Sequence, residues 1–316
     1  MKKLSFLKRR SGGQARYALP FMILGLGLLM VAPTSAFAKT NIFACAPEWG
    51  ALAQEVAGDT ANIYTASNAN QDIHYMRAKP SLLAAMRKAD LVICSGASLE
   101  IGWLPILLNK AGSNQVQEGA VGSIMASDYV PLLGVMQEKA DRSMGHVHPE
   151  GNPHVHLDPN NILTISKVIA ERLSEIDTAN AQAYESNQSA FANRWAQAMS
   201  QWQSDAQSLK GQNIIVYHKS WTYLLAWLGI NNIASLEPKP GVPPTAAHLE
   251  KILNDIQGKN AIGILVAPFE SDKAAKWLSE KSGTPIIRLP FTVGGNEQAQ
   301  DLESLFSDTI QRLHKK

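Results

Sequence analysis

Histidine is unevenly distributed in this chain, and four of its eight histidines fall within the short stretch 144–159. These four are His146, His148, His154 and His156. Neutral imidazole is the commonest side-chain ligand for zinc and similar metals. A cluster this dense in a chain otherwise poor in histidine indicates a metal site. The alternative is a solvated polar loop that is merely rich in histidine.

Two isolated histidines, His74 and His218, resemble His154 in position, because each follows an expected strand or lies in an irregular loop. In open α/β sheets, the loops at the carboxyl ends of the strands meet at the binding crevice. We therefore predict that these three histidines converge on one metal ion. Three imidazoles and a carboxylate would suit zinc, whereas manganese prefers more oxygen ligands.

Each histidine also has an ordinary structural interpretation. His74 could be a surface or capping residue, and His218 could be a satisfied core histidine, because it follows the apolar run 214–217. His146 and His148 are expected to be mobile and solvated, with at most weak metal capture.

The elements that must position these residues alternate between strands and helices. Apolar runs at 41–46, 62–65 and 91–94 predict strands, with helical spacing between them. The pattern returns after residue 210, with strands expected at 213–217, 232–236, 261–267 and 285–289. Such alternation is typical of a parallel sheet covered by helices on both faces.

One long helical stretch, 177–209, separates the two alternating regions. Its aromatic residues recur one or two turns apart and predict a face packed in the core: Tyr184, Phe191, Trp195 and Trp202. A helix of about 30 residues would be about 45 Å long, enough to run along a protein of two domains.

The first 38 residues have the pattern of a secretion signal. A basic segment precedes the apolar run 18–31, and Ala38 ends a small-x-small cleavage pattern. A retained anchor is the alternative, although the run is shorter than the roughly 20 residues that a spanning helix needs. No cysteine follows the apolar run, so we expect a free periplasmic protein. Without this segment, 23 basic and 27 acidic residues remain, which argues against a nucleic-acid partner.

The two cysteines, Cys45 and Cys94, both lie in sequence expected to be exported, where a disulfide is permitted. Each also sits near the end of an apolar run and could be a small buried hydrophobic residue. If their strands are parallel neighbours, the geometry of a bridge is awkward. The pairing is left open, and no C-x-x-C spacing indicates a cysteine metal site.

Several stretches together resemble the zinc/manganese-type solute-binding proteins of bacterial ABC importers, solute-binding family 9. They follow one another in the same order over essentially the whole chain after residue 38. The matching stretches are QDIHY at 71–75, KPS at 79–81, ADLVICSGA at 89–97, LE at 99–100, NPHVHLDP at 152–159, YH at 217–218 and EPKPG at 237–241.

The resemblance implies an α/β fold in which two (β/α) lobes with parallel sheets are joined by one long rigid helix. A metal ion would lie in the cleft between the lobes. We place the lobes at 39–176 and 210–316, and the connecting helix at 177–209.

The resemblance also carries the family's metal ligands over onto His74, His154 and His218. It implies capture of zinc, or possibly manganese, and delivery to a membrane permease. We expect a monomer that binds and releases metal without being an enzyme.

The fourth ligand is where the chain departs from this pattern. Many relatives supply an aspartate after the last strand, but the corresponding loop here, 291–295, contains no carboxylate. The candidates are Glu270, Asp272, Glu237 or a water. We predict Glu270, which follows a strand on the expected cleft side, although it could be an exposed charge in a first helical turn. His156 replaces a residue that is often aromatic in relatives and is a possible alternate ligand.

A secreted zinc hydrolase is the alternative from another functional class, with three histidine ligands and an open fourth position. The chain contains no H-E-x-x-H motif. The only obvious general base beside a candidate ligand is Asp72, which we expect to orient its neighbour instead.

Overall fold

The computed structural model describes residues 38–111, 113–136 and 148–315. The expected signal segment, apart from Ala38, and His146 lie outside these ranges. Residues 39–316 form one compact unit.

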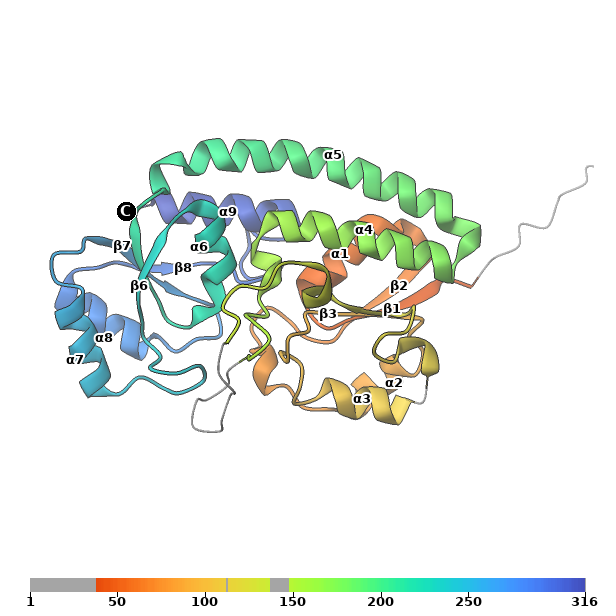
Figure 1. Cartoon of the computed structure of the whole chain (residues 1–316), viewed down its shortest axis with the longest axis horizontal. Coiled ribbons are helices and arrows are strands. Elements are labelled where there is room, and N and C mark those ends of the chain that lie inside the picture. Colours follow the sequence, from red (N-terminus) through yellow and green to blue (C-terminus); the bar gives the residue numbers. More distant parts are fainter. Residues whose placement is uncertain (1–37, 112, 137–147, 316) are drawn as a thin grey trace, which may run out of the picture. The chain divides into compact units, whose positions relative to one another are not determined.

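Two four-stranded parallel sheets form the framework of this unit (Figure 1). The first has the order β2-β1-β3-β4 and the second the order β6-β5-β7-β8. In each, the chain passes from its first strand to one neighbour and then crosses to the other side. This produces a switch point between β1 and β3, and another between β5 and β7, where α/β proteins bind ligands. The strands are β1 Thr40–Ala44, β2 Ala61–Thr65, β3 Leu91–Cys94, β4 Ser123–Met125, β5 Asn213–Val216, β6 Asn231–Ser235, β7 Ala261–Val266 and β8 Ile286–Arg288.

The helices of the first region begin where the sequence provides a favourable first residue. Pro47, Pro80 and Pro159 open α1, α2 and α4, since proline has the helical φ and lacks an amide hydrogen that would be unpaired there. The helices of this region are α1 Pro47–Ala57, α2 Pro80–Met86, α3 Leu104–Ala111 and α4 Pro159–Ile176. Those after α5 are α6 Thr222–Leu228, α7 Ala246–Asp255, α8 Asp272–Ser282 and α9 Leu302–His314.

Helix α5, Ala181–Asp205, is extended by 3-10 turns at 178–180 and 206–209. It contacts α1 and α4 from the first region and α9 from the second (Figure 1). Its aromatic residues are buried as predicted, and Trp195 and Trp202 both pack on Phe306 of α9. The largest hydrophobic core accordingly runs without interruption from β1 to α9. The prediction of two α/β lobes joined by a long helix is confirmed.

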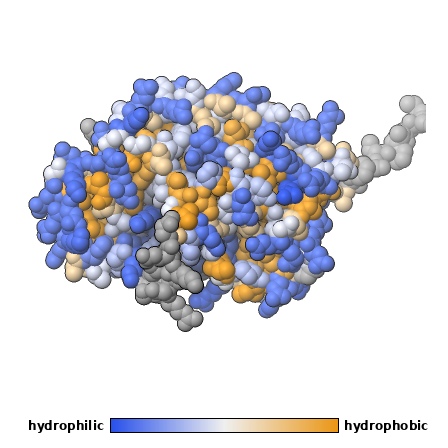
Figure 2. All heavy atoms as spheres, viewed as in Figure 1, coloured by the Kyte–Doolittle hydropathy of each residue, from blue (hydrophilic) through white to orange (hydrophobic). Residues whose placement is uncertain are grey.

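The surface of this unit mixes hydrophilic and hydrophobic residues (Figure 2). No helix among the described residues combines the length and the apolar character needed to cross a bilayer. On the face shown in Figure 2, hydrophobic residues form separate patches among hydrophilic ones. Scattered apolar residues of this kind are normal on a folded protein.

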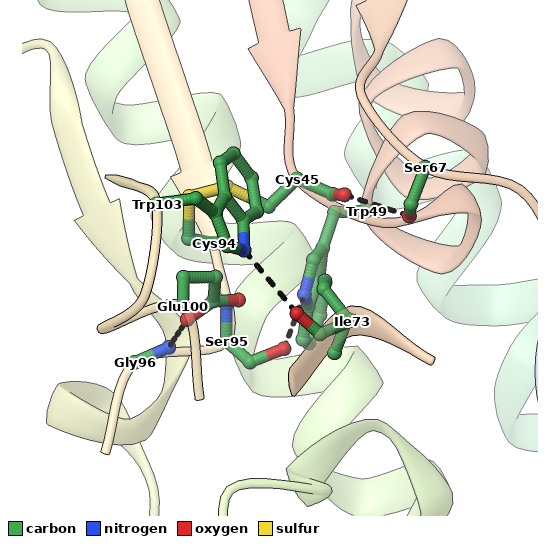
Figure 3. The surroundings of a disulfide bond; sticks show 9 residues. All are labelled: Cys45, Trp49, Ser67, Ile73, Cys94, Ser95, Gly96, Glu100 and Trp103. Atoms are coloured by element: carbon green, nitrogen blue, oxygen red, sulfur yellow. Dashed lines mark hydrogen bonds between the residues drawn. A yellow bond between two sulfur atoms is a disulfide. The ribbon is translucent and has the colours of Figure 1, made fainter. Parts of the chain in front are cut away.

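Cys45 and Cys94 form a disulfide, which settles the pairing left open by the sequence (Figure 3). Their strands are indeed parallel neighbours, but Cys45 lies one residue past the end of β1. Its Cα is 4.9 Å from that of Cys94, within the usual range for a bridge. The parallel pairing of the two strands therefore does not prevent the bridge.

The disulfide also lies beside loops that lead toward the histidines (Figure 3). The Cys45 carbonyl accepts a hydrogen bond from Ser67, in the loop that follows β2. Trp103 donates to the carbonyl of Ile73, the residue before His74. The disulfide thus joins the carboxyl ends of β1 and β3, where the loops that follow these two strands begin.

We expect replacement of both cysteines (Cys45→Ala with Cys94→Ala) to lower the free energy of unfolding by about 2–4 kcal/mol, because the bridge closes a loop of 49 residues. Denaturant unfolding with and without a reductant measures this. The reductant should destabilise the wild type and leave the double variant unchanged. Equal stability of the two proteins under oxidising conditions would contradict the prediction.

Candidate metal centre

Three histidines from distant parts of the chain meet in this structure. One ring nitrogen from each of His74, His154 and His218 lies within 4.8 Å of the others. His74 lies in a 3-10 turn, Ile73–Tyr75, that follows β2 and its loop, and His154 immediately precedes another, Val155–Leu157, before α4. His218 comes shortly after β5. The loops that follow β2 and β5, together with the segment before α4, therefore bring together the three residues that the sequence singled out.

Carboxylates fix the orientation of two of these rings. Asp72 Oδ1 is 2.7 Å from Nδ1 of His74, and Glu237 Oε2 is 2.6 Å from Nδ1 of His218. A proton on each Nδ1 donates to the carboxylate, which leaves the Nε2 lone pair free to bind a metal. Carboxylate–histidine–metal arrangements of this type orient metal ligands in many proteins.

The charge state of Asp72 fits this orienting role. Burial raises the pKa of Asp72, but the hydrogen bonds and charge of His74 outweigh burial, and the pKa lies below its usual value. Asp72 therefore remains an ionised acceptor for the His74 ring at neutral pH.

His154 is the deepest member of the cluster, with 2% of its surface exposed. Neither of its ring nitrogens has a hydrogen-bond partner among the described residues. Burial, together with the neighbouring His74 and His218, holds its pKa well below the usual value, so the ring is neutral. A buried polar group without a partner calls for an explanation, and a metal ion bound by the lone pair would provide one.

The carboxylates considered as a fourth ligand differ in what they contact. Glu237 is engaged by His218 and by the amide of Gly241. Asp272 pairs with Arg288 and Lys276, and the Arg288 guanidinium holds the pKa of Asp272 below its usual value. Both of these carboxylates are therefore already engaged by other groups.

Glu270, the residue predicted as fourth ligand, is more available. Its Oε2 accepts from the amide of Ala267, whereas Oε1 is buried without a partner among the described residues. Burial raises the pKa of Glu270 to about 7. The compact group of ligand atoms nevertheless consists of the three histidines without Glu270.

His148 lies beside this cluster, although the sequence did not place it with the three predicted ligands. It was expected to be solvated, but it is half-buried, and its Nε2 lies 3.2 Å from Nε2 of His74. Its Nδ1 lies 2.9 Å from the carbonyl oxygen of Ala97. No local sequence signal indicates this placement, because Ala97 and His74 are 51 and 74 residues away.

His156 is turned toward the last βα loop. Its Nε2 donates to the carbonyl of Phe291, and its Nδ1 lies 3.4 Å from Glu48 of α1. Glu48 also accepts a hydrogen bond from Thr292. The loop that lacks a carboxylate is thus tied to the opposite lobe through a buried polar cluster.

This combination of fold and site defines a two-lobed α/β protein with converging histidines between its sheets. The family model for the zinc-uptake complex component A, periplasmic (ZnuA), matches residues 42–316. The chain therefore belongs to this family, whose description is that of an uptake component and not of an enzyme.

Curated relatives are distant and include proteins named for different metals. The zinc-binding lipoprotein AdcA of Streptococcus pneumoniae is 24% identical over 73% of this chain. The match covers 45% of AdcA, so the chain spans about half the length of that relative. The manganese ABC transporter substrate-binding lipoprotein PsaA of S. pneumoniae is 22% identical, over 84% of this chain and 83% of PsaA.

Solved structures show the same fold. A crystal structure of ZnuA aligns with a TM-score of 0.72 at 21% identity, covering 87% of this chain and 98% of that one. A periplasmic metal binding protein from Candidatus Liberibacter asiaticus aligns with a TM-score of 0.70 at 17% identity and the same coverages.

We expect Glu270→Gln to stabilise the metal-free protein at alkaline pH. In the unfolded chain this carboxyl ionises near pH 4.5, but in the folded protein only near pH 7. Folding of the wild type therefore becomes less favourable as pH rises through this interval, by a total of ~3 kcal/mol. Glutamine cannot ionise, so the variant avoids this loss of stability. Its side-chain oxygen can still accept the hydrogen bond from the Ala267 amide.

Urea unfolding in the presence of a chelator, at pH 5 and pH 8, measures the effect. The matched control is Asp272→Asn, which removes a paired carboxylate with a lowered pKa and should destabilise the protein at pH 8. A Glu270→Gln variant no more stable than the wild type at pH 8 would contradict the expected burial penalty.

Proposed function

We propose that this protein captures a divalent transition metal outside the cytoplasm, above all zinc, and delivers it to the membrane permease of an ABC importer. The observation that carries the proposal is the convergence of three imidazoles with available lone pairs, at His74, His154 and His218. Two are oriented by carboxylates, and the third is buried without a partner among the described residues. Such a set of nitrogen ligands suits zinc.

Family membership supports transport as the purpose of this binding. The family is described as the periplasmic component of a zinc-uptake complex. A periplasmic location would follow from cleavage after Ala38, as predicted from the first 38 residues. The partners would be the metal and a permease, and the binding protein would act as a monomer.

We also propose that the lobes, 39–176 and 210–316, move little relative to each other when metal binds. The continuous core that α5 and α9 share with α1 supports this, because a large hinge motion would have to break it. Loading would instead be signalled by local movement of the loops that carry the histidines. Small shifts of this kind are a recognised class of switching transition.

The fourth coordination position has two candidates. Glu270, predicted from the sequence, has a buried oxygen without a partner among the described residues. His148 already contacts the His74 ring.

The double variant His74→Ala with His218→Ala should lose tight zinc binding, with affinity reduced by more than about 100-fold. Loss of an outer-shell partner alone typically costs 10–100-fold, and this variant removes two direct ligands. Competitive titration against a chromophoric chelator measures the change.

The matched control is His248→Ala with His314→Ala, which removes the same number of histidines outside the cluster. It should bind zinc as the wild type does. Retained tight binding in the His74/His218 variant, with its fold intact by circular dichroism, would refute the proposed site.

A further inference from the structure

The rings of His148 and His74 face each other through their Nε2 atoms, which lie 3.2 Å apart. The Nδ1 of His148 points at the Ala97 carbonyl and carries a proton, so its Nε2 is a lone-pair acceptor. The Nδ1 of His74 donates to Asp72, so its Nε2 is also an acceptor. In these neutral tautomers the two Nε2 lone pairs face each other across 3.2 Å, an arrangement that a proton or a metal ion shared between the rings stabilises.

The separation of these two nitrogens suits a shared metal. In a tetrahedral site with Zn–N distances near 2.0–2.1 Å, neighbouring nitrogens are about 3.3 Å apart. The 3.2 Å between the Nε2 atoms of His74 and His148 matches this edge of the tetrahedron.

His148 is held in this position by an unusual turn at the end of β3. Residues 96–98 all have left-handed backbone conformations, with φ of 78° for Gly96, 44° for Ala97 and 63° for Ser98. Consecutive non-glycine residues in this region are strained, and such strain persists only when surrounding contacts enforce it. We therefore interpret the turn as an element that positions His148.

Two groups of contacts involve this turn. One group holds its conformation, and the other connects it to segment 148–150. Buried Glu100 accepts hydrogen bonds from the amides of Ser95 and Gly96 (Figure 3). On the other side of the turn, Ala97 accepts from His148, and the Ser98 hydroxyl donates to Glu150. Segment 148–150 is thus fixed at two points, two residues apart.

From this arrangement we propose that His148 is the fourth metal ligand and completes an all-nitrogen site with His74, His154 and His218. This inference rests on the proposed function and names the residue that makes the site selective for zinc over manganese. A carboxylate in the fourth position would suit manganese better. The two orienting carboxylates, Asp72 and Glu237, balance the double charge of the ion.

Completing the site requires a limited movement. His148, His154 and His218 line one cavity of about 670 Å³, so the His148 ring has space to approach the other two. It lies outside the compact group of three, and the ion would draw it inward. Loading would therefore pull on segment 148–150 and its contacts with the strained turn.

X-ray absorption at the zinc edge of the loaded, full-length protein tests the assignment. The wild type should show four imidazole nitrogens, and His148→Gln should show three with one oxygen. Glu270→Gln should leave the wild-type spectrum unchanged, as should the control His314→Gln. Competitive titration should show that His148→Gln lowers zinc affinity by about 10–100-fold and narrows the preference for zinc over manganese.

A wild-type spectrum with three imidazoles and one oxygen, altered by Glu270→Gln and not by His148→Gln, would overturn the inference and leave the proposed function intact. Absence of tight zinc binding in the wild type itself would overturn both. Thermal unfolding of metal-free His148→Gln, expected to match the wild type, separates loss of a ligand from loss of the fold.

Discussion

A buried imidazole with no hydrogen-bond partner is costly, and this constraint at His154 organises the site around it. The ring is almost fully buried and is held neutral by burial and by the histidines beside it. Protonation would place a cation among neighbouring imidazoles in a poorly solvated site. Coordination of a metal ion satisfies the lone pair, which explains why a residue this unfavourable alone is buried among the other histidines.

The rest of the fold places other rings around His154 and limits their freedom. Two sheets with the same strand order direct loops from the carboxyl ends of their strands at one region, and α5 packs with both lobes in a shared core. Asp72 and Glu237 fix the ring orientations, so that the lone pairs are already directed before metal arrives. Preorganisation of this kind reduces the ordering that binding requires.

Much of this arrangement could be predicted from the sequence, because it depends on local patterns. Apolar runs revealed the strands, and His74 and His218 could be located because each is the isolated histidine of its loop. Asp72 was expected to orient a neighbour because it lies two residues from His74. The aromatic spacing of α5 predicted a buried face correctly.

What the sequence did not reveal depends on contacts between distant segments. The disulfide depends on how Cys45 leaves the end of β1. The position of His148 depends on a strained turn at Ala97 and Ser98, whose left-handed conformation is unusual for residues other than glycine. Glu237 was considered as a ligand, whereas its contact with His218 appears only once β5 and β6 are paired.

The most direct test of the central claim is a crystal structure of the protein grown with equimolar zinc, with anomalous data collected on both sides of the zinc edge. We expect one strong anomalous peak per chain, about 2.1 Å from a ring nitrogen of each of His74, His154 and His218. A chain with no peak among these rings, or with its strongest peak elsewhere, would show that these histidines do not form the zinc site.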